Sequence, residues 1–282
     1  PARFPHRRGA SEPRRAIESR SGAVAVNPAA HTQTLRLLSY NIQTGLETRR
    51  HHEYLTKSWH HLVPHPQRQR NLERIAAMLS QYDVVGLQEV DSGSLRSGFV
   101  DQTEYLAHRA GFPYWRKQIN RNMGHIAQHS NGLLSRFRPS SVEDHRLPGL
   151  PGRGAMICEY GRDSEKLAIF IVHLALGSRA RRRQLGFIGE LVKSYRYAVL
   201  MGDLNCTCSA DEMRQLMDRS GLQEPACEKP TFPSWRPARR FDHILVSESL
   251  EMVDSRVLDY PLSDHLPISV DIRLPERVDF AA

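Results

Sequence analysis

The stretch YAVLMGDLNCT, residues 197–207, decides how the rest of the sequence is interpreted. Its apolar beginning predicts a buried strand, which ends in Gly202 and two polar residues, Asp203 and Asn205. Because successive side chains of a strand alternate between its faces, Asp203 and Asn205 are expected on one side, with Leu204 toward the core. A carboxylate beside an amide can bind a hard divalent cation or a water and donate to a phosphate oxygen. The same residue types favour turns, so this stretch alone leaves both interpretations open.

Composition and charge limit the class of protein. The chain has 282 residues, of which 40% are hydrophobic and 25% charged, as in ordinary globular proteins, and its length fits one large domain. No apolar run approaches the roughly 20 residues that span a bilayer, and the start shows no signal-peptide core, although a targeting segment upstream of Pro1 stays open. The formal net charge of +8 favours polyanionic partners, either nucleic acid or an acidic membrane surface.

Cysteine usage indicates the compartment. The four cysteines, Cys158, Cys206, Cys208 and Cys227, are too few for a disulfide scaffold and favour a reducing compartment. We therefore expect a cytoplasmic protein, and since no feature indicates an obligate protein partner, a monomer is expected. Cys206 and Cys208 resemble half of a zinc site, but no matching pair of ligands follows at finger-like spacing, so packing residues are the preferred interpretation.

The chain is predicted to contain one domain between two tails. Residues 1–33 mix Pro, Arg, Ser, Ala and Gly without apolar periodicity, which indicates a disordered basic arm. Residues 34–276 form the predicted domain, and residues 277–282 form a C-terminal tail. Within the domain, residues 46–66 carry five histidines at irregular spacing. This spacing favours a flexible loop near the site over a dedicated metal cluster.

Apolar periodicity predicts the order of the helices and strands. Helical spacing is found in residues 67–82, 101–110 and 178–195, and a capping box of Ser209 and Glu212 predicts a further short helix. Strands are predicted in residues 35–41, 83–91, 112–118, 130–137, 154–161, 166–177, 197–201 and 241–247, with two more within 252–274. The pattern alone predicts a mixed α/β domain.

Several predicted strands end in side chains suited to metal or phosphate chemistry. Asn41, Glu89 and His173 occupy such positions, in addition to Asp203, and Asp242 stands near the start of the strand predicted for residues 241–247. Each has an ordinary explanation, such as a surface glutamate or a hydrogen-bonded core histidine. If these strand ends converge on one rim, they form a hard-metal phosphodiester site, because carboxylate and amide oxygens suit Mg2+ or Mn2+.

Basic and aromatic residues near these strand ends are candidates for substrate binding. Arg181 and Arg182 lie in the first turn of an expected helix, where cations oppose the helix dipole, so an anion site and a solvated charged face remain alternatives. Trp235 and Arg239 lie in a proline-containing loop, where such side chains suit stacking and phosphate contact or simply cover the core. Asn131 stands at the entrance of another predicted strand.

The order of the motifs resembles the metal-dependent endonuclease/exonuclease/phosphatase superfamily, which includes pancreatic-type deoxyribonuclease, abasic-site endonucleases, sphingomyelinases and inositol-phosphate phosphatases. The matching motifs, in order, are SYNIQTG, LQEVD, NGLLSRF, VHLALG, MGDLN, FDHIL and SDHLPI, and they cover roughly residues 35–274. The resemblance implies a four-layer α/β/β/α sandwich of two mixed β-sheets flanked by helices. Phe241 departs from the family, in which an aliphatic residue more often precedes this Asp-His pair, and only a packing adjustment is expected there.

The resemblance implies a metal site with Mg2+ or Mn2+ as the cofactor. Glu89 would be the principal metal carboxylate, helped by Asn41 and Asp264. Asp203 and Asn205 would orient the attacking water and the scissile phosphate.

The resemblance also implies roles for three residues in proton transfer and phosphate binding. His265 would act as general base or acid, with Asp242 orienting its imidazole, and His173 would donate to the phosphoryl oxygens. Asp264 and His265 are adjacent, so both reach the site only if the proline-flanked segment around them is irregular.

The expected function is Mg2+-dependent phosphodiester hydrolysis, with DNA or RNA as the leading substrate because of the basic balance. One alternative is a phospholipid, inositol phosphate or other small phosphoester, since arginine also suits acidic lipid headgroups. Another is a non-catalytic nucleic-acid-binding module. Such a module would show substitutions at Glu89, Asp203, Asp242 or His265, and none is present.

Overall fold

Strands that are apolar on both faces determine the layered architecture. In β7 (Glu165–His173), Leu167, Ile169 and Ile171 pack between two sheets, whereas Phe170 and its neighbours on the other face pack against helices. These side chains are fully buried. Such a strand must be covered on both sides, so it requires a layer on each face of its sheet.

The computed structural model describes residues 33–45, 66–122, 128–149, 151–162, 165–225 and 229–278. The predicted N-terminal arm (1–33), His-rich loop (46–66) and C-terminal tail (277–282) lie wholly or mostly outside these residues. The described residues belong to one unit, Thr32–Ala282.

The first sheet contains six strands, and its register brings two predicted site residues together. The strands are β1 (Thr34–Asn41), β2 (Val84–Val90), β3 (Tyr114–Asn122), β4 (Gln128–Ser135), β11 (Glu251–Val257) and β12 (Ile268–Arg273). Their order is β11-β12-β1-β2-β4-β3, with β1 and β2 parallel and the other neighbours antiparallel. Asn41 lies opposite Gln88, which is next to Glu89.

The second sheet also contains six strands and aligns three predicted site residues. Besides β7, its strands are β5 (Ser141–Arg146), β6 (Gly154–Arg162), β8 (Tyr197–Asp203), β9 (Leu222–Gln223) and β10 (Asp242–Ser247). Their order is β5-β6-β7-β8-β10-β9. The parallel pair of β7 and β8 sets His173 opposite Asp203, and the antiparallel pair of β8 and β10 sets Asp203 opposite Asp242.

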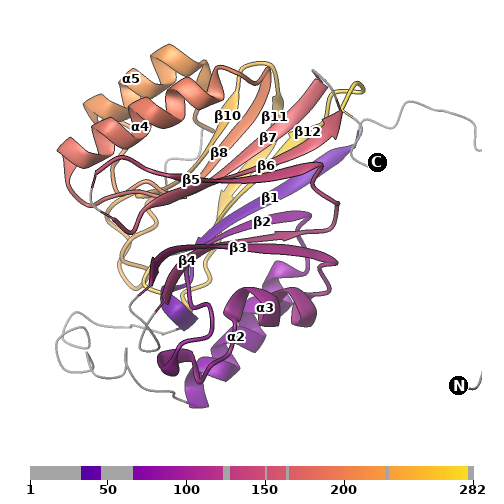
Figure 1. Ribbon diagram of the computed structural model, residues 1–282, viewed down its shortest axis with the longest axis vertical. Helices are drawn as coiled ribbons and strands as arrows, with labels where there is room; N and C mark the ends of the chain where they lie inside the picture. The colour runs from indigo at the N-terminus through magenta and orange to yellow at the C-terminus, as the bar shows by residue number, and fades with distance from the viewer. Residues whose placement is uncertain are drawn as a thin grey trace, which may run out of the picture. The chain divides into compact units, whose positions relative to one another are not determined.

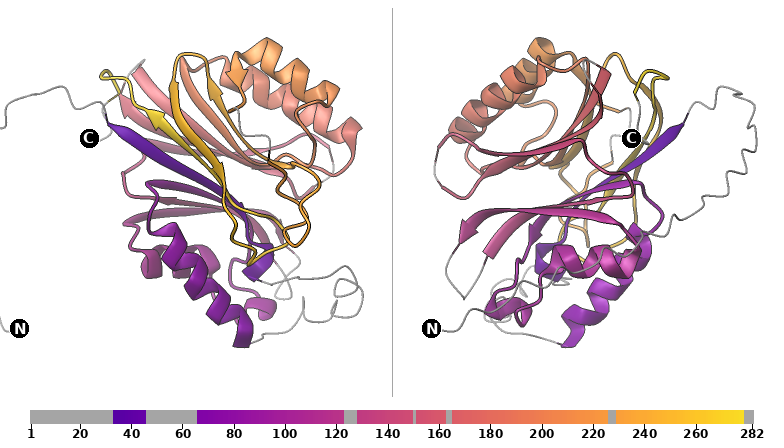
Figure 2. Two further views of the ribbon diagram at one scale, coloured as in Figure 1. Left: turned by 180° about the vertical axis from the view of Figure 1, so that it is seen from behind. Right: turned by 45° about the vertical axis from the view of Figure 1, so that its right-hand side comes forward.

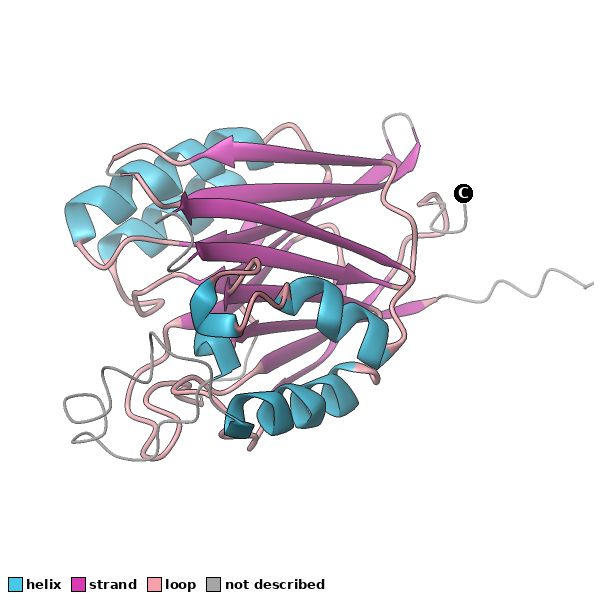
Figure 3. Cartoon of the chain, turned by 60° about the horizontal axis from the view of Figure 1, so that its bottom comes forward, coloured by secondary structure: helices cyan, strands magenta, loops and turns pink. Residues whose placement is uncertain are grey.

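Helices cover the outer face of each sheet (Figure 1). The helices α2 (Pro66–Leu79) and α3 (Gln102–Ala110) pack on the first sheet, and α4 (Ser178–Val192) and α5 (Asp211–Ser220) pack on the second. Figures 2 and 3 show the same arrangement from other sides, with the strands between the two helix pairs. The predicted α/β/β/α sandwich of two mixed sheets is therefore confirmed.

Two further features bear on the expected setting of the protein. The described helices include none that is long and apolar enough to cross a membrane. Cys158, Cys206 and Cys208 are free thiols. Cys206 is buried, which agrees with its interpretation as a packing residue, and Cys208 is half-buried.

The capping box predicted for Ser209 and Glu212 is wrong. The N-cap of α5 is Ala210, and no side chain caps the helix. Ser209 Oγ instead lies 2.9 Å from Thr207 Oγ1, and the Glu212 carboxylate accepts hydrogen bonds from Arg181. A charge-assisted bond to a buried guanidinium is stronger than one to a backbone N–H, so the tertiary contact prevails over the local one.

The apolar pattern also does not predict β5. Its sequence, SVEDHR, is polar, and its side chains are half-buried or exposed. β5 is the edge strand of its sheet, where one face need not be apolar.

Gly202 allows β8 to end where Asp203 enters the site. Its φ is +151°, and a Cβ at this position would lie 1.9 Å from the carbonyl oxygen of Val172 on the neighbouring strand.

We expect Gly202→Ala to push β8 away from β7 and to lower the free energy of unfolding by more than about 3 kcal/mol, the upper end of overpacking costs. Denaturant unfolding measures the loss. Gly186→Ala is the matched control, since a Cβ there meets nothing within 4 Å, and equal stability of the two variants would contradict this explanation.

Candidate active site

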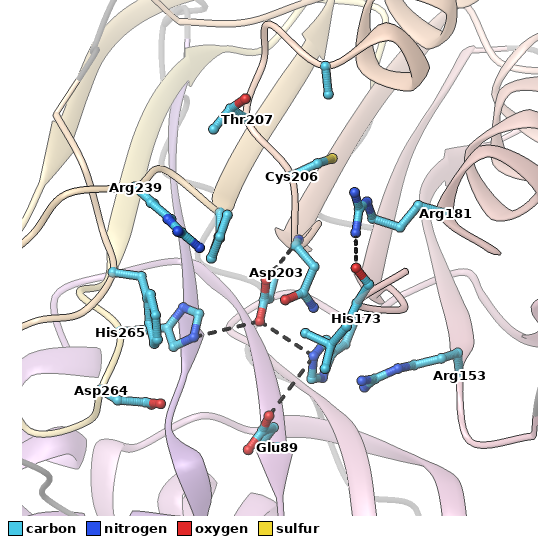
Figure 4. Close-up of a pocket in the computed structure, with 15 residues that line it drawn as sticks. Glu89, Arg153, His173, Arg181, Asp203, Cys206, Thr207, Arg239, Asp264 and His265 are labelled. Carbon is cyan, nitrogen blue, oxygen red and sulfur yellow. Dashed lines mark hydrogen bonds and ion pairs between the residues drawn. The ribbon is translucent and has the colours of Figure 1, made fainter. Parts of the chain in front are cut away.

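The strand ends of the two sheets meet at one cleft. Asn41, at the end of β1, donates from Nδ2 to Asp203 Oδ2 at 3.1 Å, and this bond joins the two sheets. Figure 4 shows that Glu89, His173 and His265 point toward Asp203 or toward one another. The structure thus brings together side chains that lie far apart in the sequence.

The cleft has a volume of about 740 Å³ and contains most of the predicted site residues. The predicted residues that line it are Glu89, His173, Arg181, Asp203, Asn205, Arg239, Asp264 and His265. Its other lining residues are Arg153, Leu176, Cys206, Thr207, Ala210, Phe232 and Phe241.

Asp264 and His265 both line the cleft although they are adjacent in the chain. The segment that carries them is irregular, because β11 ends at Val257 and β12 begins at Ile268. Ser234 N donates to the Asp264 carbonyl at 2.7 Å and holds this segment in place. The predicted irregular segment is therefore present, and it turns both side chains toward the site.

His265 is buried between two carboxylates. Its Nδ1 lies 2.8 Å from Asp242 Oδ2, and its Nε2 lies 3.8 Å from Asp203 Oδ2. Burial alone would lower the pKa of His265, but the charges of Asp242 and Asp203 outweigh burial and raise this pKa well above its usual value. Thr231 Oγ1 donates to Asp242 Oδ2 at 2.6 Å and fixes the carboxylate that orients the ring. The arrangement favours a positively charged imidazole of fixed orientation.

Asp203 is a buried carboxyl whose pKa lies near neutral pH. Burial raises the pKa of Asp203 to about 7. The charge of His265 opposes this rise, and the carboxylates of Asp242 and Glu89 add to it. A carboxyl with such a pKa suits acid–base chemistry at physiological pH.

Two asparagines donate hydrogen bonds to the carboxylate of Asp203, one from its side chain and one from its backbone. Asn41 donates to its Oδ2, as noted, and accepts at Oδ1 from Gln43 N at 3.1 Å. The backbone N–H of Asn205 donates to Asp203 Oδ1 at 3.0 Å, and Asn205 Nδ2 donates to the Leu174 carbonyl at 2.9 Å. Asn205 thereby links the end of β8 to the turn that follows β7.

Glu89 enters the cleft through an irregularity in β2. Its φ is +56°, and the pairing of β2 with β4 shifts register at this point. Burial raises the pKa of Glu89, and the carboxylate of Asp264 raises it further.

His173 lies between two of these carboxylates. Its Nε2 is 4.0 Å from Glu89 Oε1 and 3.4 Å from Asp203 Oδ2. Burial and nearby cations lower the pKa of His173 well below its usual value, which favours a neutral ring.

The charge distribution fits a divalent cation. Asp203, Asp242 and His265 form one compact group, with ligand atoms within 4.8 Å of one another. Asp242 is not among the lining residues of the cleft. Its Oδ2 accepts from Thr231 and lies 2.8 Å from His265 Nδ1, whereas its Oδ1 is buried without a hydrogen-bond partner. Glu89 and Asp264 do line it, and their mutual repulsion leaves negative charge for a cation to compensate.

Three residues predicted to bind substrate are not among the lining residues of the cleft. Asn131 is buried, and its Nδ2 donates to Gln118 Oε1 at 3.1 Å and to the Gly154 carbonyl at 3.2 Å. Arg182 is exposed and lines a separate depression beside α5, because one step along a helix rotates a side chain to another face. Trp235 is half-buried in the loop before β10.

Arg181 lines the cleft, but its guanidinium is bound within the protein. Its Nε and Nη2 donate to Glu212 Oε1 at 3.2 and 3.0 Å. Its Nη1 donates to the carbonyls of Ala175 and Leu176. Arg181 therefore ties α4 to α5 and to the turn after His173, and a contact with substrate stays a prediction.

We expect Arg181→Met to destabilise the protein by about 3–5 kcal/mol, because the Glu212 carboxylate would stay buried without its partner. Replacing both residues, as in Arg181→Met with Glu212→Leu, should recover most of the loss, since no buried charge is then left unpaired. Denaturant unfolding of the two variants measures the difference. If the double variant were no more stable than the single one, the ion pair would not be the cause.

Arg153 is a cleft residue that the sequence patterns miss. Its positive charge opposes the rise in the pKa of Glu89 and adds to the fall in the pKa of His173. It follows the turn LPGLPG and stands directly before β6. The sequence signal that could have identified Arg153 is a basic residue between a turn rich in Gly and Pro and a buried strand.

Two phenylalanines form an aromatic wall of the cleft. The rings of Phe232 and Phe241 are stacked with centroids 5.6 Å apart, and the Phe232 ring lies 4.8 Å from that of His265. The Arg239 guanidinium lies 5.9 Å from the Phe241 centroid. The expectation of a mere packing adjustment at Phe241 is thus incomplete, because the ring lines the cleft.

Behind this wall, His243 supports the loop that carries Cys206. The fully buried ring lies with Nε2 2.8 Å from the Cys206 carbonyl and Nδ1 2.7 Å from Glu224 Oε1. Arg240 Nη2 lies 3.0 Å from the same Oε1. Burial alone would raise the pKa of Glu224, but the hydrogen bond from His243 and the charges of His243 and Arg240 hold it below its usual value.

We expect Glu224→Gln to lower stability at neutral pH by about 1.5–3 kcal/mol, as for a lost charged hydrogen bond. A carboxyl whose pKa is depressed by folding stabilises the protein above its unfolded pKa, and this contribution is lost as pH falls through the folded pKa. The difference between wild type and variant should therefore shrink as pH falls below the ordinary value of 4.5. Unfolding at a series of pH values measures it, and a constant difference would contradict the assignment.

Buried carboxylates, histidines and amides at the strand ends of an α/β/β/α sandwich define a phosphoesterase type of site. The chain belongs to the Endonuclease/Exonuclease/phosphatase family, whose sequence profile matches residues 38–265.

Solved structures share this fold at low sequence identity. The endonuclease/exonuclease/phosphatase of Beutenbergia cavernae is 20% identical, with a TM-score of 0.66 over 86% of this chain and 72% of that chain. A mannosyl-6-phosphatase of Bacteroides thetaiotaomicron is 18% identical, with a TM-score of 0.63 over 84% and 99%. The human Nocturnin catalytic domain is 17% identical, with a TM-score of 0.63 over 86% and 95%. A search of curated proteins finds no match to this sequence.

Proposed function

We propose that the protein is a Mg2+-dependent phosphodiesterase that hydrolyses nucleic acid. The observation that carries the proposal is the cleft in which Glu89, Asp203, Asp264 and His265 meet. The net charge of +8 and two arginines on the cleft wall, Arg153 and Arg239, support a polyanionic substrate.

The proposed metal ligands are Glu89 and Asp264, with Asn41 next to them. Their oxygen atoms are the donor type that Mg2+ and Mn2+ prefer. Burial, and then the charge of Asp264, raise the pKa of Glu89, and a cation beside both carboxylates would favour their charged forms. When bound, the cation would offset negative charge on the phosphoryl group.

We assign the orientation of the attacking water, the binding of the phosphoryl group and the transfer of protons to residues of the chain itself. Asp203 and Asn205 orient the attacking water, and Asp203, with a pKa of about 7, can accept its proton. The neutral His173 donates a hydrogen bond to a phosphoryl oxygen. His265, held as a cation by Asp203 and Asp242, donates a proton to the leaving oxygen.

The test is hydrolysis of supercoiled and linear DNA, structured RNA and bis(p-nitrophenyl) phosphate, each with Mg2+, Mn2+ or EDTA. We expect cleavage of nucleic acid with either metal and none with EDTA. Turnover of the generic diester alone would redirect the proposal to lipid or small phosphoesters. Binding of nucleic acid without turnover of any substrate would instead indicate a non-catalytic module.

We also propose that the protein acts as a monomer in the cytoplasm. The buried free thiols of Cys158 and Cys206 are consistent with a reducing compartment. Light scattering after size-exclusion chromatography tests the monomer, and sedimentation with anionic vesicles tests the alternative of an acidic membrane surface.

A further inference from the structure

A second groove adjoins the cleft. It has a volume of about 470 Å³ and is lined by residues of β3 and β5 and, after β5, by Leu147, Gly149, Pro151, Gly152 and Arg153. β3 and β5 are the edge strands of the two sheets, so the groove runs between the two layers at one side of the sandwich. Arg153 lines both the groove and the cleft, so the two depressions adjoin at this side chain.

The floor of the groove is built from polar groups of both sheets. Gln118 Nε2, from β3, donates to the Ala155 carbonyl at 3.0 Å on β6 of the other sheet. A Cβ at Gly154 would lie 2.2 Å from Asn120 Oδ1 and 2.6 Å from Gln118 Oε1, so glycine allows these amides to sit over the strand. Asn131 supports Gln118 from below through the bond described above.

The charges on the groove favour an anion. Asp144 is paired with Arg116 at 3.6 Å, and His145 lies 3.3 Å from Glu143. Arg146, in contrast, is exposed, and none of the described carboxylates lies within ion-pair distance of it. The groove therefore has one arginine at the boundary with the cleft and a second, uncompensated one on β5.

We propose that this groove binds a single strand of nucleic acid next to the scissile phosphate, with Arg146 contacting a backbone phosphate. The inference rests on the proposed function, which it extends from the cleft to the adjoining nucleotides. A groove with the exposed Arg146, with Arg153 at its boundary with the cleft and with Asn120 on its wall suits a sugar-phosphate chain.

The experiment compares Arg146→Ala with wild type on a single-stranded oligonucleotide and on bis(p-nitrophenyl) phosphate, which is too small to extend beyond the cleft. We expect the ratio of the two kcat/KM values, oligonucleotide over generic diester, to fall about tenfold, mainly through KM. Binding of a labelled oligonucleotide to Arg146→Ala in EDTA should lose about one unit of its salt dependence.

Arg138→Ala is the matched control. Arg138 is exposed and follows the C-terminal end of β4. Because β4 runs antiparallel to β2, whose C-terminal end lies at the cleft, Arg138 lies at the end of the sheet away from the cleft. Loss of the same basic charge there should leave the ratio unchanged.

The possible outcomes test the assignment of the groove and the proposed function separately. If wild type cleaves the oligonucleotide and Arg146→Ala matches it in ratio and salt dependence, the groove assignment is overturned while the nuclease stands. If wild type neither binds nor cleaves the oligonucleotide, both are overturned. Binding to anionic lipid vesicles that Arg146→Ala weakens, without binding to the oligonucleotide, would assign the groove to lipid headgroups instead.

Discussion

Replacement of His265 by alanine is expected to lower kcat for every phosphodiester substrate by about 10²–10⁴-fold, the usual contribution of a general acid or base. The ring is held at 2.8 Å by Asp242 and near Asp203, and these carboxylates keep its pKa high. Removing it eliminates the proton donor to the leaving oxygen and leaves two buried carboxylates facing each other. The measurement is kcat on bis(p-nitrophenyl) phosphate, with circular dichroism to confirm folding.

A partner variant distinguishes a catalytic from a structural role of this histidine. Asp242→Asn keeps the shape of the side chain but removes the charge that raises the pKa of His265. The limb of the pH–rate profile assigned to the acid should then move to lower pH, because the cationic ring becomes less favourable. Wild-type activity in His265→Ala, or an unchanged profile in Asp242→Asn, would refute the proton-donor assignment.

The fold and much of the cleft are predictable because buried strands leave a strong local signal. Apolar runs that end in Asn41, Glu89, His173 and Asp203 locate strand ends without any knowledge of pairing. Because β1 is parallel to β2 and β7 is parallel to β8, the C-terminal ends of each pair lie side by side at the same end of their sheet.

The contacts that the sequence does not predict are tertiary. Arg153 reaches the cleft from a loop, and a loop has no periodicity that reveals the direction of its side chains. Asn131 has a suitable residue type at a strand entrance, but its side chain points between the sheets toward Gln118. Glu212 fits a local capping motif, yet Arg181, distant in sequence, binds its carboxylate.

The interpretation of Glu89 as a metal ligand leads to two opposite effects of one substitution. Glu89→Gln keeps the side-chain volume and removes the charge. In the presence of Mg2+, kcat/KM should fall by about 10³-fold, since a metal contributes several kcal/mol of transition-state stabilisation. A titration of activity with Mg2+ should also show weaker apparent affinity. Glu104→Gln is the control, because that glutamate is exposed on α3.

In EDTA the same variant should be more stable than wild type. Burial and Asp264 raise the pKa of Glu89, so its charged form is unfavourable in the folded protein, and stability falls as pH rises above the unfolded value. Glutamine removes that cost. Added Mg2+ should then raise Tm for wild type, by linkage to binding, but much less for the variant. If Glu89→Gln lost stability in EDTA and kept the wild-type Tm response to Mg2+, Glu89 would be a structural residue and the metal would bind elsewhere.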